Sequence, residues 1–391
     1  MADVTDHRVH SDDPGPPAGR LSRRAPSTTG TARRRGLSLA TAAVATAALT
    51  AAPAAGASAD AEPRGKVQVT ELATFVTGPC TDDICSSGST IGPDGALYVT
   101  DASRGRIRRV DRASGAVTTF ADGLPRSLAG VVGGGVGDIA FRGRTAYVLV
   151  AGVSRFWTDL TQSPNAPARE GIYRLDRVGQ GSTRATLIAD LYTWSVRHPP
   201  EHPGFFVPGG FTYAMEPYRD GFLVTDGHHN RVLRVGLDGT TRAFSDFGRN
   251  VVPTGLELDG PEVLVGRAGP VPHVPETGRV VALPSPGGRP RTVATGAPLL
   301  VDVELGREQA LYGLAQGFWP YAGQDGKEGF PAAPHTGLLM RADRHGQFRT
   351  VAFHLDRPTT FELVGGSAYV VTITGKVVEV SGLGDGVATD G

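Results

Sequence analysis

The chain has 391 residues, and its 39 Lys and Arg residues balance 39 Asp and Glu residues, so no basic excess favours binding to nucleic acid. Its 54 Gly and 29 Pro residues make up about a fifth of the chain, which indicates many turns but lies below the level typical of disorder. Two cysteines exclude a disulfide-rich scaffold and a cysteine-based zinc site. The 40% of hydrophobic residues can fill a sizeable core, and a globular β protein is favoured.

Residues 1–59 have the features of an export signal. A polar stretch rich in Pro and Gly precedes three arginines at 33–35, and an apolar, Ala-rich run follows at 37–52. Residues 57–59 read Ala-Ser-Ala, a small-x-small cleavage pattern. The apolar run is too short for a transmembrane helix, and no other stretch approaches about 18 apolar residues. The alternative is a disordered cytosolic tail.

We therefore predict a signal peptide with a disordered N-terminal extension over 1–59 and a secreted or extracytoplasmic chain over 60–391. No integral membrane segment remains after cleavage, and the mature chain carries 32 basic and 35 acidic residues. The paired arginines suit twin-arginine export, but the phenylalanine expected two positions after the pair is missing, so the Sec route stays open.

A repeated pattern of four strands runs through residues 60–391. Its clearest copies are 89–123 and 211–248, each an inner hydrophobic strand, a tight turn, an alternating strand, a basic strand and a Thr-rich strand. The aligned inner-strand positions are Ile91, Ile139, Tyr213, Leu256, Val303 and Phe361. Because such units bury two faces only when packed radially, they predict an all-β, six-bladed β-propeller. Its blades are expected at about 88–123, 136–191, 211–248, 253–296, 299–356 and 358–383.

The last repeat lacks its fourth strand, while the start of the mature chain holds an unassigned one. The segment QVTELATFVTG at 68–78 matches the Thr-rich fourth strands of the other repeats. We predict that residues 67–76 complete the last blade and close the ring, which removes an exposed sheet edge.

These repeats resemble NHL-type propellers, and most closely the ScyD/ScyE family of secreted propellers. The segments that carry the resemblance are GPDGALYVTDA (92–102), GFLVTDGHHNRVLRV (221–235), VPTGLEL (252–258) and AGPVPHVPETGRVV (268–281). The resemblance covers roughly the whole mature chain and implies a fold and an export route, without an assigned reaction. Two departures are the turn GREQ in the fifth repeat and two unusually long loops.

The long insertions fall in loops that a propeller places on one face of its disk. They are 151–170, 192–210, 266–278 and 315–336. Functional residues gather in such loops on rigid scaffolds. We predict an aromatic-walled ligand site there, formed by Trp157, Trp194, Trp319, His228 and His273. The alternative is that these aromatic residues only seal the loops onto the disk.

A second candidate site lies at the central channel. One residue near the start of each inner strand is expected to point into it: Thr90, Asp138, Thr212, Gly255, Asp302 and Thr360. Asp138 and Asp302 fall in opposite blades, where they and the hydroxyls would suit a Ca²⁺ ion completed by water. The alternative is that each Asp accepts hydrogen bonds from loop amides. The Glu, Asn and Asp set of the regucalcin and gluconolactonase propellers is not recognisable.

The run after the second strand of the third repeat offers acid–base chemistry. Asp226 is followed by His228 and His229, and a His within reach of an Asp can act as an acid–base pair. The alternatives are that Asp226 organises the loop toward the following arginine and that the histidines are solvated. The HPPEH run at 198–202 is a weak metal motif because its prolines prevent a helix.

Two functions from different classes follow. The first is a non-catalytic exported propeller that binds a small molecule, glycan or protein on the insertion face; the second is a metal-assisted hydrolase, lactonase or lyase at the mouth of the channel. Because an exported protein meets an oxidising environment, Cys80 and Cys85 are expected to form a disulfide.

Overall fold

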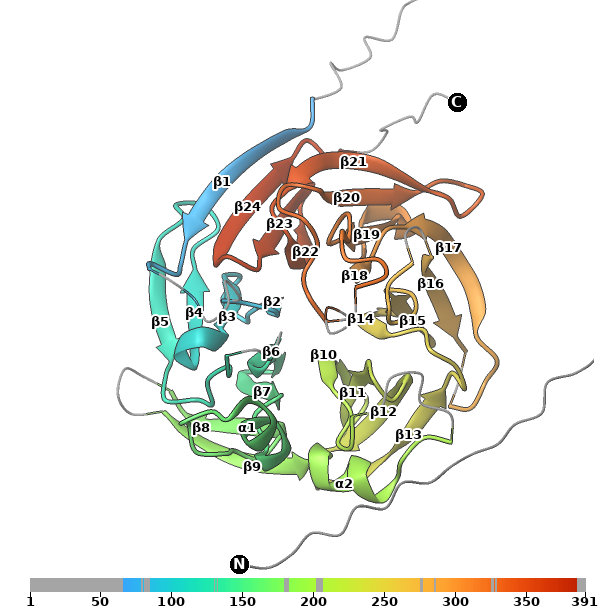
Figure 1. Cartoon of the computed structure of the whole chain (residues 1–391). Coiled ribbons are helices and arrows are strands. Elements are labelled where there is room, and N and C mark those ends of the chain that lie inside the picture. The colour runs from blue at the N-terminus through green and yellow to red at the C-terminus, as the bar shows by residue number, and fades with distance from the viewer. Residues whose placement is uncertain are drawn as a thin grey trace, which may run out of the picture. The chain divides into compact units, whose positions relative to one another are not determined.

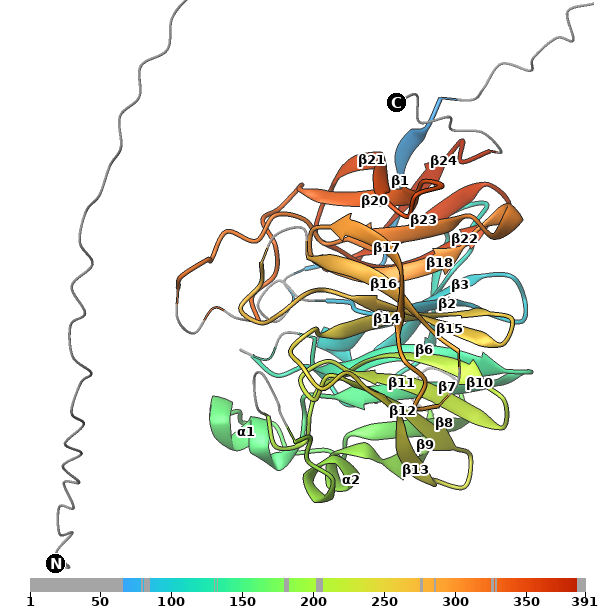
Figure 2. The same ribbon diagram turned by 90° about the vertical axis from the view of Figure 1, so that its right-hand side faces the viewer.

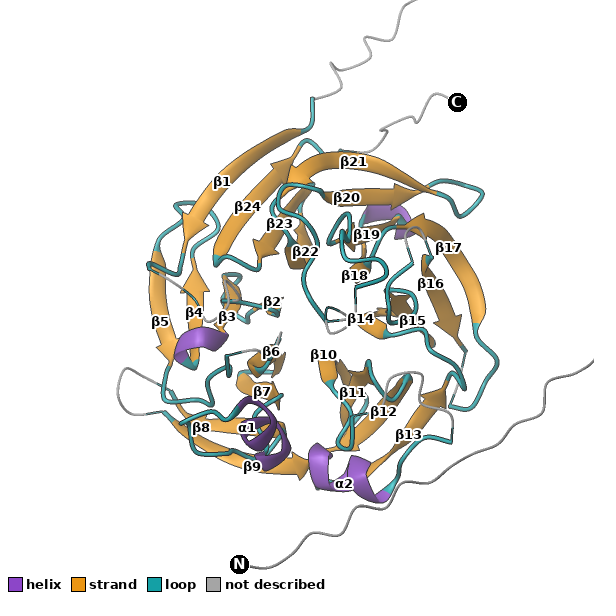
Figure 3. Ribbon diagram, viewed as in Figure 1, coloured by secondary structure: helices purple, strands orange, loops and turns teal. Residues whose placement is uncertain are grey.

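The chain forms a ring of six four-stranded antiparallel sheets in a computed structural model (Figure 1). The structure describes residues 66–384 apart from 79, 81–84, 130, 132, 179–182, 202–206, 275–276, 285, 325–326 and 328, so the predicted signal segment lies outside the described residues. The strands dominate, with a few short helical turns between them (Figure 3). The predicted six-bladed β-propeller is confirmed.

Each blade runs from an inner strand at the axis to an outer strand at the rim. Blade 1 holds β2 (Ser89–Ile91), β3 (Leu97–Asp101), β4 (Arg106–Val110) and β5 (Val117–Ala121). Blade 2 holds β6 (Gly135–Arg142), β7 (Thr145–Ala151), β8 (Gly171–Arg177) and β9 (Arg184–Asp190). Blade 3 holds β10 (Thr212–Tyr218), β11 (Gly221–Asp226), β12 (Arg231–Gly236) and β13 (Thr241–Asp246).

The second half of the ring repeats this order. Blade 4 holds β14 (Pro253–Asp259), β15 (Glu262–Arg267), β16 (Gly278–Leu283) and β17 (Arg291–Ala297). Blade 5 holds β18 (Leu300–Leu305), β19 (Leu311–Ala315), β20 (Gly337–Ala342) and β21 (Phe348–Leu355). Blade 6 holds β22 (Pro358–Val364), β23 (Ser367–Thr372), β24 (Lys376–Ser381) and β1 (Gln68–Thr74). The helical elements are η1 (Ala102–Arg104), α1 (Arg155–Thr161), α2 (Leu191–Arg197) and η2 (Arg307–Gln309).

The N-terminal strand closes the ring, as predicted. β1 pairs antiparallel with β24, from Gln68 opposite Ser381 to Thr74 opposite Lys376, and Figure 1 shows the blue strand beside the red one. Beyond β1, the amides of Phe75 and Val76 both donate to the carbonyl of Gly375. The two ends of the propeller are thus joined in one sheet, and blade 6 keeps no unpaired outer edge at β24.

Hydrophobic residues pack between neighbouring blades. Ile107 of blade 1 meets Val136, Ile139 and Val148 of blade 2 in one buried cluster. Successive side chains of a strand point to opposite faces of its sheet, so each sheet presents hydrophobic residues to the blades on both sides. Both faces are buried only because the blades pack in a ring.

One predicted register was wrong. In β10, Met215 pairs with Val224 and is buried, and it takes the inner-strand position that the sequence alignment gave to Tyr213. The residue equivalent to Asp138 is therefore Ala214 rather than Thr212. Every second position of this segment is hydrophobic, at Phe211, Tyr213 and Met215. A shift of the alignment by two residues therefore keeps the hydrophobic pattern and cannot be detected from it.

The insertions project from one side of the disk. Figure 2 shows α1, α2 and the loop between β19 and β20 on the same side, opposite the short hairpin turns. We call this side the insertion face.

Cys80 and Cys85, in the segment leading into blade 1, form a disulfide. Cys85 itself is fully buried beside Phe75 and Val76.

Candidate functional site

Acidic side chains line the central channel. Inner strands of four consecutive blades carry a glutamate directly after a core residue, at Glu216, Glu257, Glu304 and Glu362. Blades 1 and 2 have Gly92 and Ala140 at this position. These glutamates were not predicted from the sequence, although a hydrophobic residue followed by Glu recurs in the repeats.

The channel contains a small polar chamber. Its volume is about 60 Å³, enough to hold water. Its walls include Asp138, Asp302 and three of the glutamates, together with Ser89 and Tyr213. The Ser89 hydroxyl lies 3.2 Å from an oxygen of Glu362.

The shared burial of these carboxyls shifts their titration upward. Burial, followed by the charges of Asp302 and Asp138, raises the pKa of Glu362 to about 8. Burial also raises the pKa of Asp302 to about 7. Burial and then the charges of Glu362 and Glu257 raise the pKa of Glu304 well above its usual range. At neutral pH part of this layer is protonated, so the chamber holds both proton donors and acceptors.

Asp138 and Asp302 tie neighbouring blades together. One oxygen of Asp138 accepts from its next amide, that of Ile139, and the other accepts from Met215 N in blade 3 at 2.7 Å. In blade 5, Asp302 accepts from Val303 N, from the Thr360 hydroxyl at 2.8 Å and from Phe361 N at 3.0 Å. The alternative described from the sequence was that loop amides donate to these aspartates; the amides that donate here belong to inner strands.

Glycines in the preceding blades make room for both aspartates. A Cβ added to Gly88 would come within 2.3 Å of Asp138 Oδ1, and one added to Gly255 within 2.2 Å of Asp302 Oδ1. The order of glycine, aspartate and donating backbone amide thus occurs in blades 1 to 3 and again in blades 4 to 6. Within the described ranges no three His, Cys, Asp or Glu side chains are grouped as a metal site would need. The Ca²⁺ site at Asp138 and Asp302 stays a prediction.

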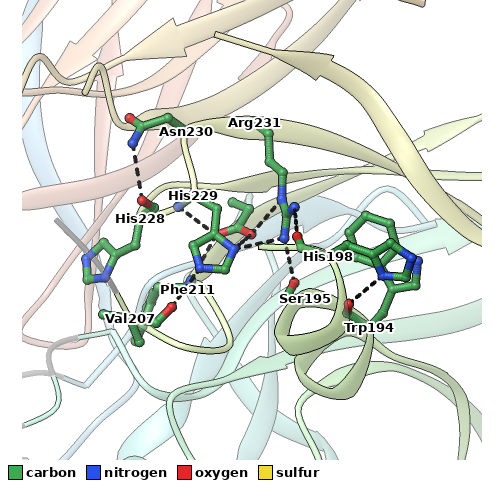
Figure 4. A network of polar contacts seen from close by, with 10 residues as sticks. Trp194, Ser195, His198, Val207, Phe211, His228, His229, Asn230 and Arg231 are labelled. Atoms are coloured by element: carbon green, nitrogen blue, oxygen red, sulfur yellow. Dashed lines mark hydrogen bonds and ion pairs between the residues drawn. The ribbon is translucent and has the colours of Figure 1, made fainter. Parts of the chain in front are cut away.

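Asp226 and its partners form a buried cluster. Figure 4 shows the polar contacts of His229 and Arg231 within it. Asp226 lies 3.3 Å from His229 Nδ1 and 3.2 Å from Arg231 Nε, and all three residues are buried. Arg231 also donates to the Ser195 hydroxyl at 2.9 Å and to the carbonyl of His198 at 2.6 Å. The cluster therefore fastens α2 to β11 and β12.

Electrostatics in this cluster favour the ion pair. Burial alone would raise the pKa of Asp226, but the hydrogen bond and charge of His229 and the charge of Arg231 outweigh it and hold that pKa below its usual range. His229 Nε2 meets the carbonyl of Val207 at 2.7 Å. A substrate has no access to a pair that is 0% exposed, so the loop-organising alternative for Asp226 is supported by geometry.

His228 points away from that cluster. In Figure 4 its ring lies on the far side of His229 from Arg231, and its centroid is 5.6 Å from that of Phe211. Burial lowers the pKa of His228 to about 4, so its ring is neutral at physiological pH. Phe211 in turn contacts Trp157, at 5.7 Å between ring centroids.

His273 belongs to a second row of aromatic rings on the same face. Its ring meets Trp319 edge-on at 5.3 Å, and Trp319 contacts Tyr321 at 5.7 Å. Burial, opposed by a hydrogen bond to the Pro270 backbone and assisted by the charge of His228, lowers the pKa of His273 to about 4. The structure thus brings His228 and His273 within electrostatic range, as the ligand-site hypothesis requires.

The three tryptophans do not share one cleft. Trp157 is 8% exposed and Trp319 is 4% exposed, each packed within its own insertion, and the Trp319 indole donates to the carbonyl of Phe330 at 3.1 Å. Trp194 lies on α2 near the rim, stacked on His198 at 4.4 Å and beneath the Arg231 guanidinium. Of the predicted set, Trp157 joins His228 through Phe211 and Trp319 contacts His273, while Trp194 lies apart from both rows.

Comparison with known proteins identifies solved structures with a similar fold. No family model matches the sequence, and no curated protein matches it. A gluconolactonase from Xanthomonas campestris is 12% identical, covering 83% of this chain and 93% of its own with a TM-score of 0.52. A protein of unknown function from Bacteroides thetaiotaomicron is 10% identical, covering 80% and 75% with a TM-score of 0.51. Virginiamycin B lyase from Staphylococcus aureus is 12% identical, covering 81% and 99% with a TM-score of 0.48.

At these identities the similarity shows the fold alone. The class that the architecture defines is the six-bladed β-propeller.

Proposed function

We propose that this protein is an exported propeller of the ScyD/ScyE type that binds a small molecule, glycan or protein on its insertion face. The site is the region between the Trp157–Phe211–His228 row and the His273–Trp319 row. No reaction is assigned to it.

Two buried polar atoms carry the proposal. Trp157 Nε1 and His273 Nδ1 have no hydrogen-bond partner among the described residues. A buried polar atom left without a partner costs about 1–3 kcal/mol, so a ligand or water that pairs with it gains that energy. Because both histidines are neutral, the site suits an uncharged ligand with an aromatic or sugar ring.

Export is supported by a disulfide as well as by the N-terminal pattern. A disulfide joins Cys80 and Cys85, as is typical of proteins outside the reducing cytosol. None of the helices in the described part of the chain is long and apolar enough to cross a membrane. Expression in a secreting host tests this directly: intact-mass analysis of the medium should find a chain beginning near Asp60 with no free thiol.

The binding experiment uses a panel of neutral aryl glycosides and indoles, screened by a rise in melting temperature and quantified by calorimetry. His273→Phe keeps a ring against Trp319 and removes both nitrogens, so it should weaken binding about tenfold while the fold is retained. The exposed, remote Phe353→Leu is the matched control. Equal affinity in wild type and His273→Phe would refute the site.

The channel favours a second candidate function. Its carboxyls have raised pKa values, with Glu362 near 8 and Asp302 near 7. Such poised groups suit general acid–base catalysis, and the fold resembles that of a gluconolactonase. Hydrolysis of a sugar lactone that is lost in Glu304→Gln and in Glu362→Gln would support a lactonase or lyase at the channel mouth. Activity unchanged in both variants would exclude it.

A further inference from the structure

One cross-strand pair in blade 4 consists of different residue types from the equivalent pairs in blades 1 and 3. In blade 1 the end of β3 and the start of β4 place Asp101 opposite Arg106. In blade 3 the same position pairs Asp226 with Arg231. In blade 4 it pairs Arg267 with Arg279, so an arginine stands where two other blades have a carboxylate.

Like charges directly opposite each other destabilise a sheet, and here Arg267 is buried while Arg279 is partly buried. Arg267 is 6% exposed, and its Nε has no hydrogen-bond partner. Throughout the described ranges it forms no ion pair; its guanidinium lies over the Phe247 ring at 5.1 Å. Arg279 donates only a long bond, 3.4 Å, to the carbonyl of Thr277.

A cavity of about 200 Å³ opens beside these groups. It is lined by Arg249, Asn250, Val251, Arg267, Gly269, Pro270, Thr277 and Arg279. The Asn250 side chain fixes one wall, since it donates to the carbonyl of Val271 at 2.6 Å and accepts from its amide at 3.1 Å. The cavity lies at the insertion face, where β15 ends and β16 begins.

Among the residues that the structure describes, the arginines around the cavity form no ion pair. Burial, followed by the neighbouring charges of Arg249 and Arg279, lowers the pKa of Arg267 to about 10, so the group stays charged at neutral pH. A buried cation without a counter-ion is costly. In blade 3 the carboxylate of Asp226 forms an ion pair with the arginine opposite it. By comparison, the component that blade 4 lacks among its described residues is an anion.

We propose that this cavity is an oxyanion-binding site in which Arg267, Arg279 and Arg249 hold the carboxylate, phosphate or sulfate group of a small molecule. The bound oxyanion takes the place that an Asp carboxylate has in blades 1 and 3. Arginine guanidinium groups recognise such planar or tetrahedral oxygens with charge-assisted hydrogen bonds. The site is independent of the ligand proposed at His228 and His273.

The experiment titrates the full mature chain with inorganic phosphate, sulfate, acetate and phenyl phosphate, with chloride at equal ionic strength as reference. Calorimetry and melting temperature both report binding, because a ligand specific for the folded state raises the melting temperature with its concentration. Tighter binding of phenyl phosphate than of phosphate identifies an organic phosphate, and preference for acetate identifies a carboxylate.

Arg267→Asp is the decisive variant because it restores the Asp–Arg pair of blades 1 and 3. We expect it to fold, to melt at or above the wild-type temperature and to lose the response to every oxyanion. Arg249→Gln changes an exposed residue and should weaken binding about tenfold without affecting folding. Arg344→Gln, an exposed arginine in another blade, is the control and should bind like wild type. Absence of oxyanion binding by wild type at millimolar concentration, or unchanged binding by Arg249→Gln, overturns the proposal.

Discussion

The phenolic hydroxyl of Tyr213 in blade 3 donates a 3.0 Å hydrogen bond to the backbone carbonyl of Thr359 in blade 6, directly across the ring. Neighbouring inner strands contact in the order β2, β6, β10, β14, β18, β22 and back to β2, so these two blades are opposite. Burial and the charges of Asp302 and Asp138 raise the pKa of Tyr213, so the hydroxyl keeps its proton and remains a donor. One side chain thus bridges the channel.

Tyr213→Phe should lower the free energy of unfolding by about 1–3 kcal/mol, because it leaves the buried Thr359 carbonyl without this donor. Urea denaturation measures the change. Tyr173→Phe is the control: its hydroxyl donates to Arg169 O at an exposed site, and its loss should cost less than about 0.5 kcal/mol. Equal losses in both variants would show that the bridge adds no stability.

Stability should fall as the pH rises from 5 to 8. The folded pKa of Glu362, about 8, lies above its unfolded value of 4.5, so the folded state binds the proton more tightly. This contribution is fully present below the unfolded pKa and is lost as the pH passes the folded pKa. Each such carboxyl changes the free energy of unfolding by about 1.4 kcal/mol per pH unit in that interval.

Denaturation of wild type and Glu362→Gln at several pH values separates this residue from its neighbours. Gln keeps the shape and cannot titrate, so the decrease with pH should be shallower in the variant. The control is Glu379→Gln, at a partly buried carboxylate on the same blade that accepts from the Ser367 hydroxyl, and its pH profile should match wild type. A parallel profile in Glu362→Gln would show that its carboxyl does not carry the effect.

Asp226→Asn should cost about 3–5 kcal/mol, since it leaves the buried Arg231 without its anionic partner. Chemical denaturation measures the loss, and the exposed Asp246→Asn should remain within about 0.5 kcal/mol of wild type. A stable Asp226→Asn protein would instead return the Asp226–His229 pair to the list of catalytic candidates.

The repeats predicted the blades because core residues such as Ile139 and Phe361 recur between Gly and Asp turns, a local pattern that needs no tertiary information. The register at Tyr213 failed because alternation tolerates a slip of two residues. The Arg267–Arg279 pair can be recognised in the sequence at the end of the second strand and the start of the third strand of blade 4. The burial of Arg267 cannot, because it depends on tertiary packing such as the contact with the Phe247 ring. The orientation of His228 away from Asp226 is likewise decided by packing against Phe211 rather than by spacing.

Trp157→Ala and Trp319→Ala should each lose about 3–5 kcal/mol of stability, because both indoles are nearly buried in their insertions. That loss alone does not distinguish a sealing role from a binding role, since the sequence supports both. Trp157→Phe does, because it keeps an aromatic ring against Phe211 and removes only the Nε1 donor that has no partner among the described residues. If a ligand pairs with that nitrogen, its affinity should fall about tenfold in calorimetry while the melting temperature of the free protein changes little. A variant that binds the neutral panel as wild type does, or a wild type that binds none of it, would leave Trp157 as packing alone.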